Sequence, residues 1–511
     1  MTNRALGVVA PVFSLRRRAD WGIGDLTALS AFGTWAKSAG ISLVQVLPPH
    51  ALFPGETSPY AARSAFALDP IYIDCERVLD VTPDMIAPHA SAIAALREKS
   101  AVAYDAVRAL KEAVLDAAFE RFVAEEWERG TARATALRAF IQAEDAWLVD
   151  FAAYAALRAK NQGKPWSEWP EAEKSHDAAM VARVRTLGIK DALSRAALAQ
   201  MYCQWLAFEQ WDAARATLRA ANVELMGDLP FIVGTDSADV WSNPGEFETT
   251  VSLGAPPDGF SAEGQDWGLP AYDWRTMDAN GLAWLRARSR HAARLYDRFR
   301  IDHVVGFFRM WVHPPGEKGR FVPATEQEQN ARGRFVLSAM IDAAKPSRII
   351  AEDLGVIPAF VHETMRALEV PGYRIIPWDR DPNFVLRNPK DSPTLSVCAF
   401  STHDTAPLLT WWPDLKDWEQ DQTGAVMGVG GKAPPHEIEQ ALFRTLAHSA
   451  SDLALMLLPE LLGENERINT PGTVGPQNWT YRMKTPVETL VEENAPRYRG
   501  LHEVMIAGAR A

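Results

Sequence analysis

Three acidic residues follow short apolar runs in the second half of the chain, and together they could cleave a glycosidic bond. Asp302 lies in FRIDHVVGF, Glu352 in RIIAEDLG and Asp404 in FSTHDTAP. Cleavage of such a bond needs one carboxylate to attack or stabilise the anomeric carbon and one carboxylic acid to protonate the leaving oxygen. If configuration is retained, the two groups lie about 5–5.5 Å apart. A single such acid could equally cap a helix or close a turn, but three in one setting favour catalysis.

Arg300 supports this interpretation because it lies two residues before Asp302. The period of a β-strand is two, so both side chains are expected on the same face. A guanidinium there would hold Asp302 ionised and oriented, which suits a nucleophile. His303 and His403 adjoin two of the acids, and each could equally be a histidine of the core.

Eight apolar runs are the elements that would have to position these residues. Continuous apolar runs that end in a polar residue are typical of buried parallel strands. Eight of them, most followed by a helical stretch, predict a (β/α)8 TIM barrel, whose active site lies at the C-terminal ends of the strands. The last run reads equally well as a buried helix. The runs are LGVVAPVF, SLVQVLP, VELMGDLP, FRIDHVVGF, RIIAEDLG, YRIIPWD, LSVCAFSTHD and LALMLLPELLG.

Composition divides the 511-residue chain into three predicted parts. Residues 1–74 carry the first two strands. Residues 75–221 are rich in Ala, Glu and Arg with helical periodicity, and they predict a mostly helical insertion. Residues 222–511 hold the rest of the barrel, including a substrate loop at about 245–275.

The net charge limits the classes of partner that are expected, and the cysteine content indicates the compartment. The net charge of −12 disfavours phosphate backbones and anionic lipids, so no nucleic-acid or membrane partner is expected. Cys75, Cys203 and Cys398 are few and far apart, which argues against a disulfide framework and favours a cytoplasmic location. No HExxH or EF-hand pattern is present, so neither a metal nor a cofactor is expected.

Several ordered segments resemble the amylomaltases, which are also called 4-α-glucanotransferases or disproportionating enzymes. The resemblance covers most of the chain outside the helical insertion. It rests on FRIDHVVGF, IIAEDLGV and STHD, and also on SPYAARSAFALDP, VELMGDLPFIVGTDSADVW, APPDGFSAEGQDWGLPAYDW and RINTPGTVGPQNWTYR.

The resemblance implies a retaining transferase that moves α-1,4-glucan segments between malto-oligosaccharides, amylose or glycogen-derived glucans, with glucose as one acceptor. Asp302 would be the nucleophile that forms a β-glucosyl-enzyme. Glu352 would protonate the leaving glucan and then deprotonate the acceptor hydroxyl. Asp404 would hold the hydroxyls of the distorted sugar, and Arg300 would orient Asp302.

Further contacts are implied around these three acids. His303 and His403 would donate hydrogen bonds to sugar hydroxyls or to the carboxylates. Aromatic faces match the C–H faces of glucose, and they would come from Tyr60 near the cleaved sugar and from a tryptophan beyond it. The remaining implied binding residues are Asp228, which helps shape the site, Trp267, which is that tryptophan, and Asn469, which contacts the glucan.

One departure from the family pattern directly follows Asp404. The family often has Asn directly after its Thr-His-Asp segment, whereas Thr405, Ala406 and Pro407 follow here. The residues alone leave two other functions open. One is an α-glucan hydrolase or branching enzyme of the α-amylase clan, and the other is a non-catalytic glucan-binding scaffold.

Overall fold

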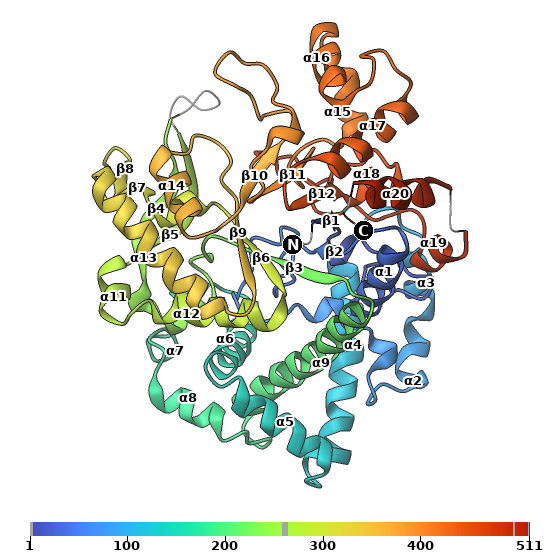
Figure 1. Ribbon diagram of the computed structural model, residues 1–511. Helices are drawn as coiled ribbons and strands as arrows, with labels where there is room; N and C mark the ends of the chain where they lie inside the picture. Colours follow the sequence, from blue (N-terminus) through green and yellow to red (C-terminus); the bar gives the residue numbers. More distant parts are fainter. Residues whose placement is uncertain (1–3, 258–263, 494–495, 509, 511) are drawn as a thin grey trace.

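Eight parallel strands close into a barrel at the centre of the computed structural model, which describes residues 4–257, 264–493, 496–508 and 510 (Figure 1). Around the barrel the order is β1-β12-β11-β10-β9-β6-β3-β2, and β2 pairs again with β1. The predicted (β/α)8 class is therefore confirmed, with each of the eight runs supplying one strand. These strands are β1 (Ala5–Val9), β2 (Leu43–Gln45), β3 (Glu224–Leu229), β6 (Arg298–Ile301), β9 (Arg348–Ala351), β10 (Gly372–Ile375), β11 (Ser396–Ala399) and β12 (Leu453–Leu457).

The ambiguous eighth run is a strand followed by a helix. All five residues of β12 are buried, as a strand covered on both faces requires. The chain then enters the short helix α18 (Leu458–Leu462), with Pro459 in its first turn. The Glu460 carboxylate accepts the backbone N–H of Leu457 at 3.0 Å, so it caps the helix at this junction.

Helices cover the outside of the barrel. α12 packs on α13, α13 on α14, and α17 on α20. Parallel neighbouring strands need a crossover connection, and α12, α13, α14 and α17 lie in such connections. α20 follows the last strand. The covering helices are α1 (Leu26–Ser38), α12 (Ala283–Leu295), α13 (Glu326–Ala344), α14 (Ala359–Ala367), α17 (Pro435–His448) and α20 (Pro496–Ala507). Other helices of the barrel part are α10 (Ala238–Ser242), α11 (Trp274–Ala279), α15 (Leu408–Trp411), α16 (Asp417–Met427) and α19 (Val487–Glu493).

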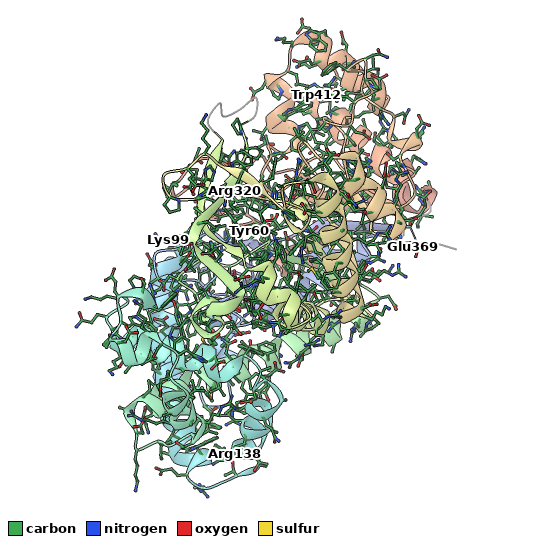
Figure 2. All side chains as sticks on the ribbon, turned by 90° about the vertical axis from the view of Figure 1, so that its left-hand side faces the viewer. Tyr60, Lys99, Arg138, Arg320, Glu369 and Trp412 are labelled. Carbon is green, nitrogen blue, oxygen red and sulfur yellow. The ribbon has the colours of Figure 1, made fainter. Side chains whose placement is uncertain are left out.

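A large group of helices lies between β2 and β3 and projects from one end of the molecule. Figure 2 places Arg138 at the far end of this group and Tyr60 near the centre of the molecule. Its longest member, α9, packs on both α6 and α1 and so joins the group to the barrel. The domain boundaries at 74 and 221 stay a prediction. The group comprises α2 (Pro83–Ile86), α3 (Ala90–Arg97), α4 (Tyr104–Phe122), α5 (Ala132–Ala143), α6 (Leu148–Lys160), α7 (Glu171–Lys174), α8 (Ala178–Arg185) and α9 (Ala192–Ala220).

A second, antiparallel sheet has the order β5-β4-β7-β8. It takes up much of the segment that was predicted as a substrate loop at about 245–275, of which residues 258–263 lie outside the described residues. Among the described residues, no helix has the length and apolar character to cross a bilayer. The strands of this sheet are β4 (Phe247–Ala255), β5 (Gln265–Tyr272), β7 (Met310–His313) and β8 (Arg320–Val322).

Candidate active site

The three predicted carboxylates line one cavity of about 910 Å³. Asp302 directly follows β6 and Glu352 directly follows β9, and these two strands are neighbours in the barrel. The last paired positions are Ile301 and Ala351, so the next residues on the two strands lie side by side. Asp404 enters from the segment after β11. The cavity therefore stands at the C-terminal ends of the strands, where barrel enzymes place their chemistry.

Most of the other predicted site residues line the same cavity, and two do not. Asp228 is fully buried in β3 beneath the cavity wall, and Asn469 is 8% exposed behind Asp404. Neither residue lines the cavity. Asp228 binds Arg300 and Asn469 binds Asp404, and both of these partners do line it. The predicted residues that do line the cavity are Tyr60, Trp267, Arg300, His303 and His403.

Arg300 joins two carboxylates. Its Nη2 lies 2.7 Å from Asp302 Oδ1, and its Nη1 lies 2.7 and 2.8 Å from the two oxygens of Asp228. Asp228 and Arg300 are paired positions on β3 and β6, which explains why the buried acid can hold the guanidinium. The planar fork of donors thus fixes Asp302 from behind and leaves its other face toward the cavity.

Glu352 lies in a setting that keeps it partly protonated at neutral pH. Its Oε2 accepts the backbone N–H of His303 at 2.8 Å and its Oε1 accepts that of Leu354 at 3.0 Å. Burial raises the pKa of Glu352 to about 7, and the charge of Asp302 adds to this effect while Arg300 and the two N–H groups oppose it. A carboxyl group that titrates near neutrality can both give and take a proton.

His303 reaches Glu352 through its backbone rather than through its ring. Its φ of 47° lies in the left-handed region, which is costly for a residue other than glycine. That conformation aims the N–H at the Glu352 carboxylate. The ring packs edge-on against Trp267, with centroids 5.2 Å apart, and burial lowers its pKa.

Asp404 is held ionised by its neighbours. Burial alone would raise its pKa, but the charge of His403 and the hydrogen bonds from His403 and Asn469 hold the pKa of Asp404 well below its usual range. Asn469 Nδ2 donates to Asp404 Oδ1 at 2.7 Å, and His403 Nε2 lies 3.4 Å from Oδ2. Asp404 therefore offers a stable negative charge to the cavity without acting as a proton donor.

The Tyr60 hydroxyl connects Asp228, which binds Arg300, to His403, which binds Asp404. Its hydroxyl donates to Asp228 Oδ2 at 2.8 Å and lies 3.0 Å from His403 Nε2. Because the hydroxyl proton goes to Asp228, the His403 ring must carry its proton on Nε2 and donate it. The two rings stack at 5.5 Å with an angle of 22° between their planes.

Sequence reasoning missed several cavity residues. Trp378 lines the cavity at 54% exposure and stands just after β10. The strand-end rule that singled out Asp302 would have found it too. Gln45, a polar residue inside the apolar run of β2, also lines the cavity. Arg467, the first residue of the RINTPGTVGPQNWTYR segment, lies outside the cavity lining, and its Nη2 donates to the Asp404 carbonyl at 3.0 Å.

Comparison with known proteins identifies the family. Residues 10–488 match the family model described as 4-alpha-glucanotransferase. The chain belongs to that family. It is 31% identical over 515 residues to the 4-alpha-glucanotransferase of Chlamydia caviae, covering 96% of this chain and 92% of that one. It is 30% identical over 499 residues to the 4-alpha-glucanotransferase of Aquifex aeolicus, covering 94% and 96%.

A solved structure of the same family agrees throughout the fold. The amylomaltase from Streptococcus agalactiae in complex with acarbose has a TM-score of 0.83 and 25% identity, with 99% of this chain and 100% of that chain covered. The resemblance drawn from sequence segments is therefore confirmed, and with it the class of enzyme. The roles of single residues in this 4-alpha-glucanotransferase rest on the geometry above.

Arg300→Lys should lower kcat for glucan transfer by about 10²-fold and change KM little. An ammonium group cannot bridge Asp228 and Asp302 in one plane, so the Asp302 carboxylate loses its fixed position. Steady-state kinetics on maltotriose measure both constants. Arg298→Lys is the matched control, because Arg298 lies at the other end of β6 and pairs with Glu224. Equal losses in the two variants would contradict a positioning role for Arg300.

Proposed function

We propose that the chain transfers α-1,4-glucan segments by double displacement, with Asp302 as nucleophile and Glu352 as acid and base. Support comes from the side-by-side strand positions of the two acids, one in an ion pair with Arg300 and one with a pKa near 7. Paired carboxyl groups in different environments are what a retaining mechanism requires.

In the first step an oxygen of Asp302 forms a bond to the anomeric carbon, and the bond from that carbon to the leaving glucan oxygen breaks. Glu352 gives its proton to the leaving oxygen. In the second step Glu352 takes the proton of the acceptor 4-hydroxyl, whose oxygen bonds to the anomeric carbon and displaces Asp302. Asp404 stabilises the positive charge that builds on the sugar in both steps.

The proposed donors are malto-oligosaccharides, amylose and glycogen-derived glucans, and glucose is one proposed acceptor. Trp267, Tyr60 and Trp378 supply aromatic surface along the cavity, which excludes water and holds an acceptor sugar. A sugar hydroxyl held beside the intermediate then reacts before water does. The net charge of −12 and three scattered cysteines support a cytoplasmic enzyme without nucleic-acid or membrane partners.

Purified protein given maltotriose should produce glucose together with chains longer than maltotriose, while the number of reducing ends stays constant. Transfer makes one glycosidic bond for each one it breaks, whereas hydrolysis adds a reducing end at each cut. Thin-layer chromatography with a reducing-sugar assay measures both quantities. A ladder that only shortens, with rising reducing ends, would point to a hydrolase. Asp302→Ala protein that is purified by the same procedure controls for contaminating activity.

A further inference from the structure

The long loop between β10 and β11 carries aromatic side chains that face solvent. Among the described residues, four Phe or Trp side chains are strongly exposed, and three of them are Trp378, Phe384 and Trp418. The first two belong to this loop, and Trp418 lies on α16. Figure 1 shows the loop extending toward the end of the molecule that holds α15, α16 and α17. Exposed aromatic side chains gathered in one place indicate a binding surface.

The tip of the loop holds Phe384 in an unfavourable conformation. Asp381 Oδ1 accepts the backbone N–H groups of Asn383 and Val385 at 2.8 and 2.9 Å, and the Phe384 N–H bonds to the Asp381 carbonyl at 2.9 Å. The closed turn gives Phe384 a φ of 62°. Glycine or asparagine is preferred there, and a bulky ring is a marked exception. Because the ring is 77% exposed, packing does not offset this cost.

Arg380 joins the loop tip to α16. Its Nη1 donates to the Phe384 carbonyl at 2.8 Å and to Gln422 Oε1 at 3.0 Å. Gln422 lies one helical turn after Trp418, so both project from the same face of α16. Phe384 and Trp418, which is 57% exposed, therefore flank one anchoring hydrogen-bond pair. We name Phe384, Val385 and Trp418 the outer platform; Val385 is 49% exposed.

We infer that the outer platform binds a distal part of the α-glucan chain whose reacting part lies in the cavity. This inference rests on the proposed function. Trp378 lines the cavity at the base of the loop, and Phe384 is exposed at the tip of the same loop, so one loop carries aromatic side chains both at the cavity and beyond it. Flat apolar rings match the C–H faces of glucose, and a neutral glucan is not repelled by this acidic protein.

Two contacts on one chain strengthen each other. A glucan held at the outer platform keeps its remaining length near the cavity at a high effective concentration, provided that the chain spans both sites. Only chains long enough to span both sites gain this raised effective concentration, and an oligosaccharide confined to the cavity does not. The outer platform thus favours amylose over maltotriose as donor.

The double variant Phe384→Asn with Trp418→Ala should raise KM for amylose by about three- to tenfold per ring removed. Its kcat and KM for maltotriose should match those of the unmodified enzyme. Phe384→Asn alone should keep or raise Tm, because Asn tolerates the left-handed region better than Phe does. That outcome would separate a binding role from a structural one. Phe335→Ala on α13 is the control, since Phe335 is also exposed, at 45%.

Migration through native gels that contain amylose gives a second, activity-independent readout. The unmodified protein should be retarded and the double variant much less so. Unchanged amylose KM and unchanged retardation in the double variant would overturn the inference, as would an equal loss with maltotriose. If the unmodified protein does not turn over maltotriose at all, the proposed function fails, and gel retardation still tests the outer platform.

Discussion

Asp302→Ala should reduce glucan transfer by about four to six orders of magnitude, because in the proposed mechanism the Asp302 carboxylate is the group that bonds to the anomeric carbon. Arg300 anchors the carboxylate at 2.7 Å, and a water molecule in its place would lack both charge and position. Initial rates on maltotriose, measured over hours at high enzyme concentration, give the residual activity. Retardation in amylose gels should persist, since the variant keeps the cavity and its aromatic lining.

Asp297→Asn, at the residue just before the same strand, provides the matched control. Asp297 precedes β6 and binds Arg215, Arg219 and the backbone N–H of Leu225, at the end of the barrel away from the cavity. In such barrels, residues at the C-terminal face carry the chemistry and residues at the opposite face contribute to stability. The control should therefore lose Tm but keep its turnover. If Asp302→Ala retained more than about a hundredth of the activity, the nucleophile would have to be another residue.

The barrel could be predicted from sequence because its strands are buried on both faces. Such strands appear as continuous apolar runs, and all eight runs became strands. Only the run ending in Leu462 was ambiguous, since an apolar run alone does not separate a strand from a buried helix. The antiparallel sheet was missed because β4 is half-exposed and irregular, with register shifts against β5 and no steady alternation.

The site could be predicted as a set of residues but not as a set of contacts. The strand period placed Arg300 beside Asp302, and the ion pair is there. The pairing of Arg300 with Asp228 depends on which strands are neighbours and in which register, and these are non-local properties of the barrel. The role of His303 could not be predicted for the same reason, because its backbone N–H rather than its side chain contacts Glu352.

Glu352→Gln should lower kcat/KM for maltotriose by about 10²- to 10⁴-fold and remove the alkaline limb of the pH profile. In the proposed mechanism the first step needs Glu352 protonated. Since burial raises its pKa to about 7, the rate of the unmodified enzyme should fall as pH rises through 7 and should not fall for this reason below it. An amide cannot titrate, so the variant's rate should be flat across the same range. Initial rates between pH 5 and 9 measure this, with pH-jump controls for stability.

A donor that leaves without a proton separates the two duties of Glu352. With α-glucosyl fluoride, departure of fluoride needs little acid assistance, so Glu352→Gln should still form the bond between Asp302 and the sugar. The missing base should then slow the second step, and the glucosyl-enzyme should accumulate. Intact-mass spectrometry would detect one added glucosyl group, absent when Asp302 is also replaced by Ala. An alkaline limb that persists in Glu352→Gln would contradict Glu352 as the proton donor.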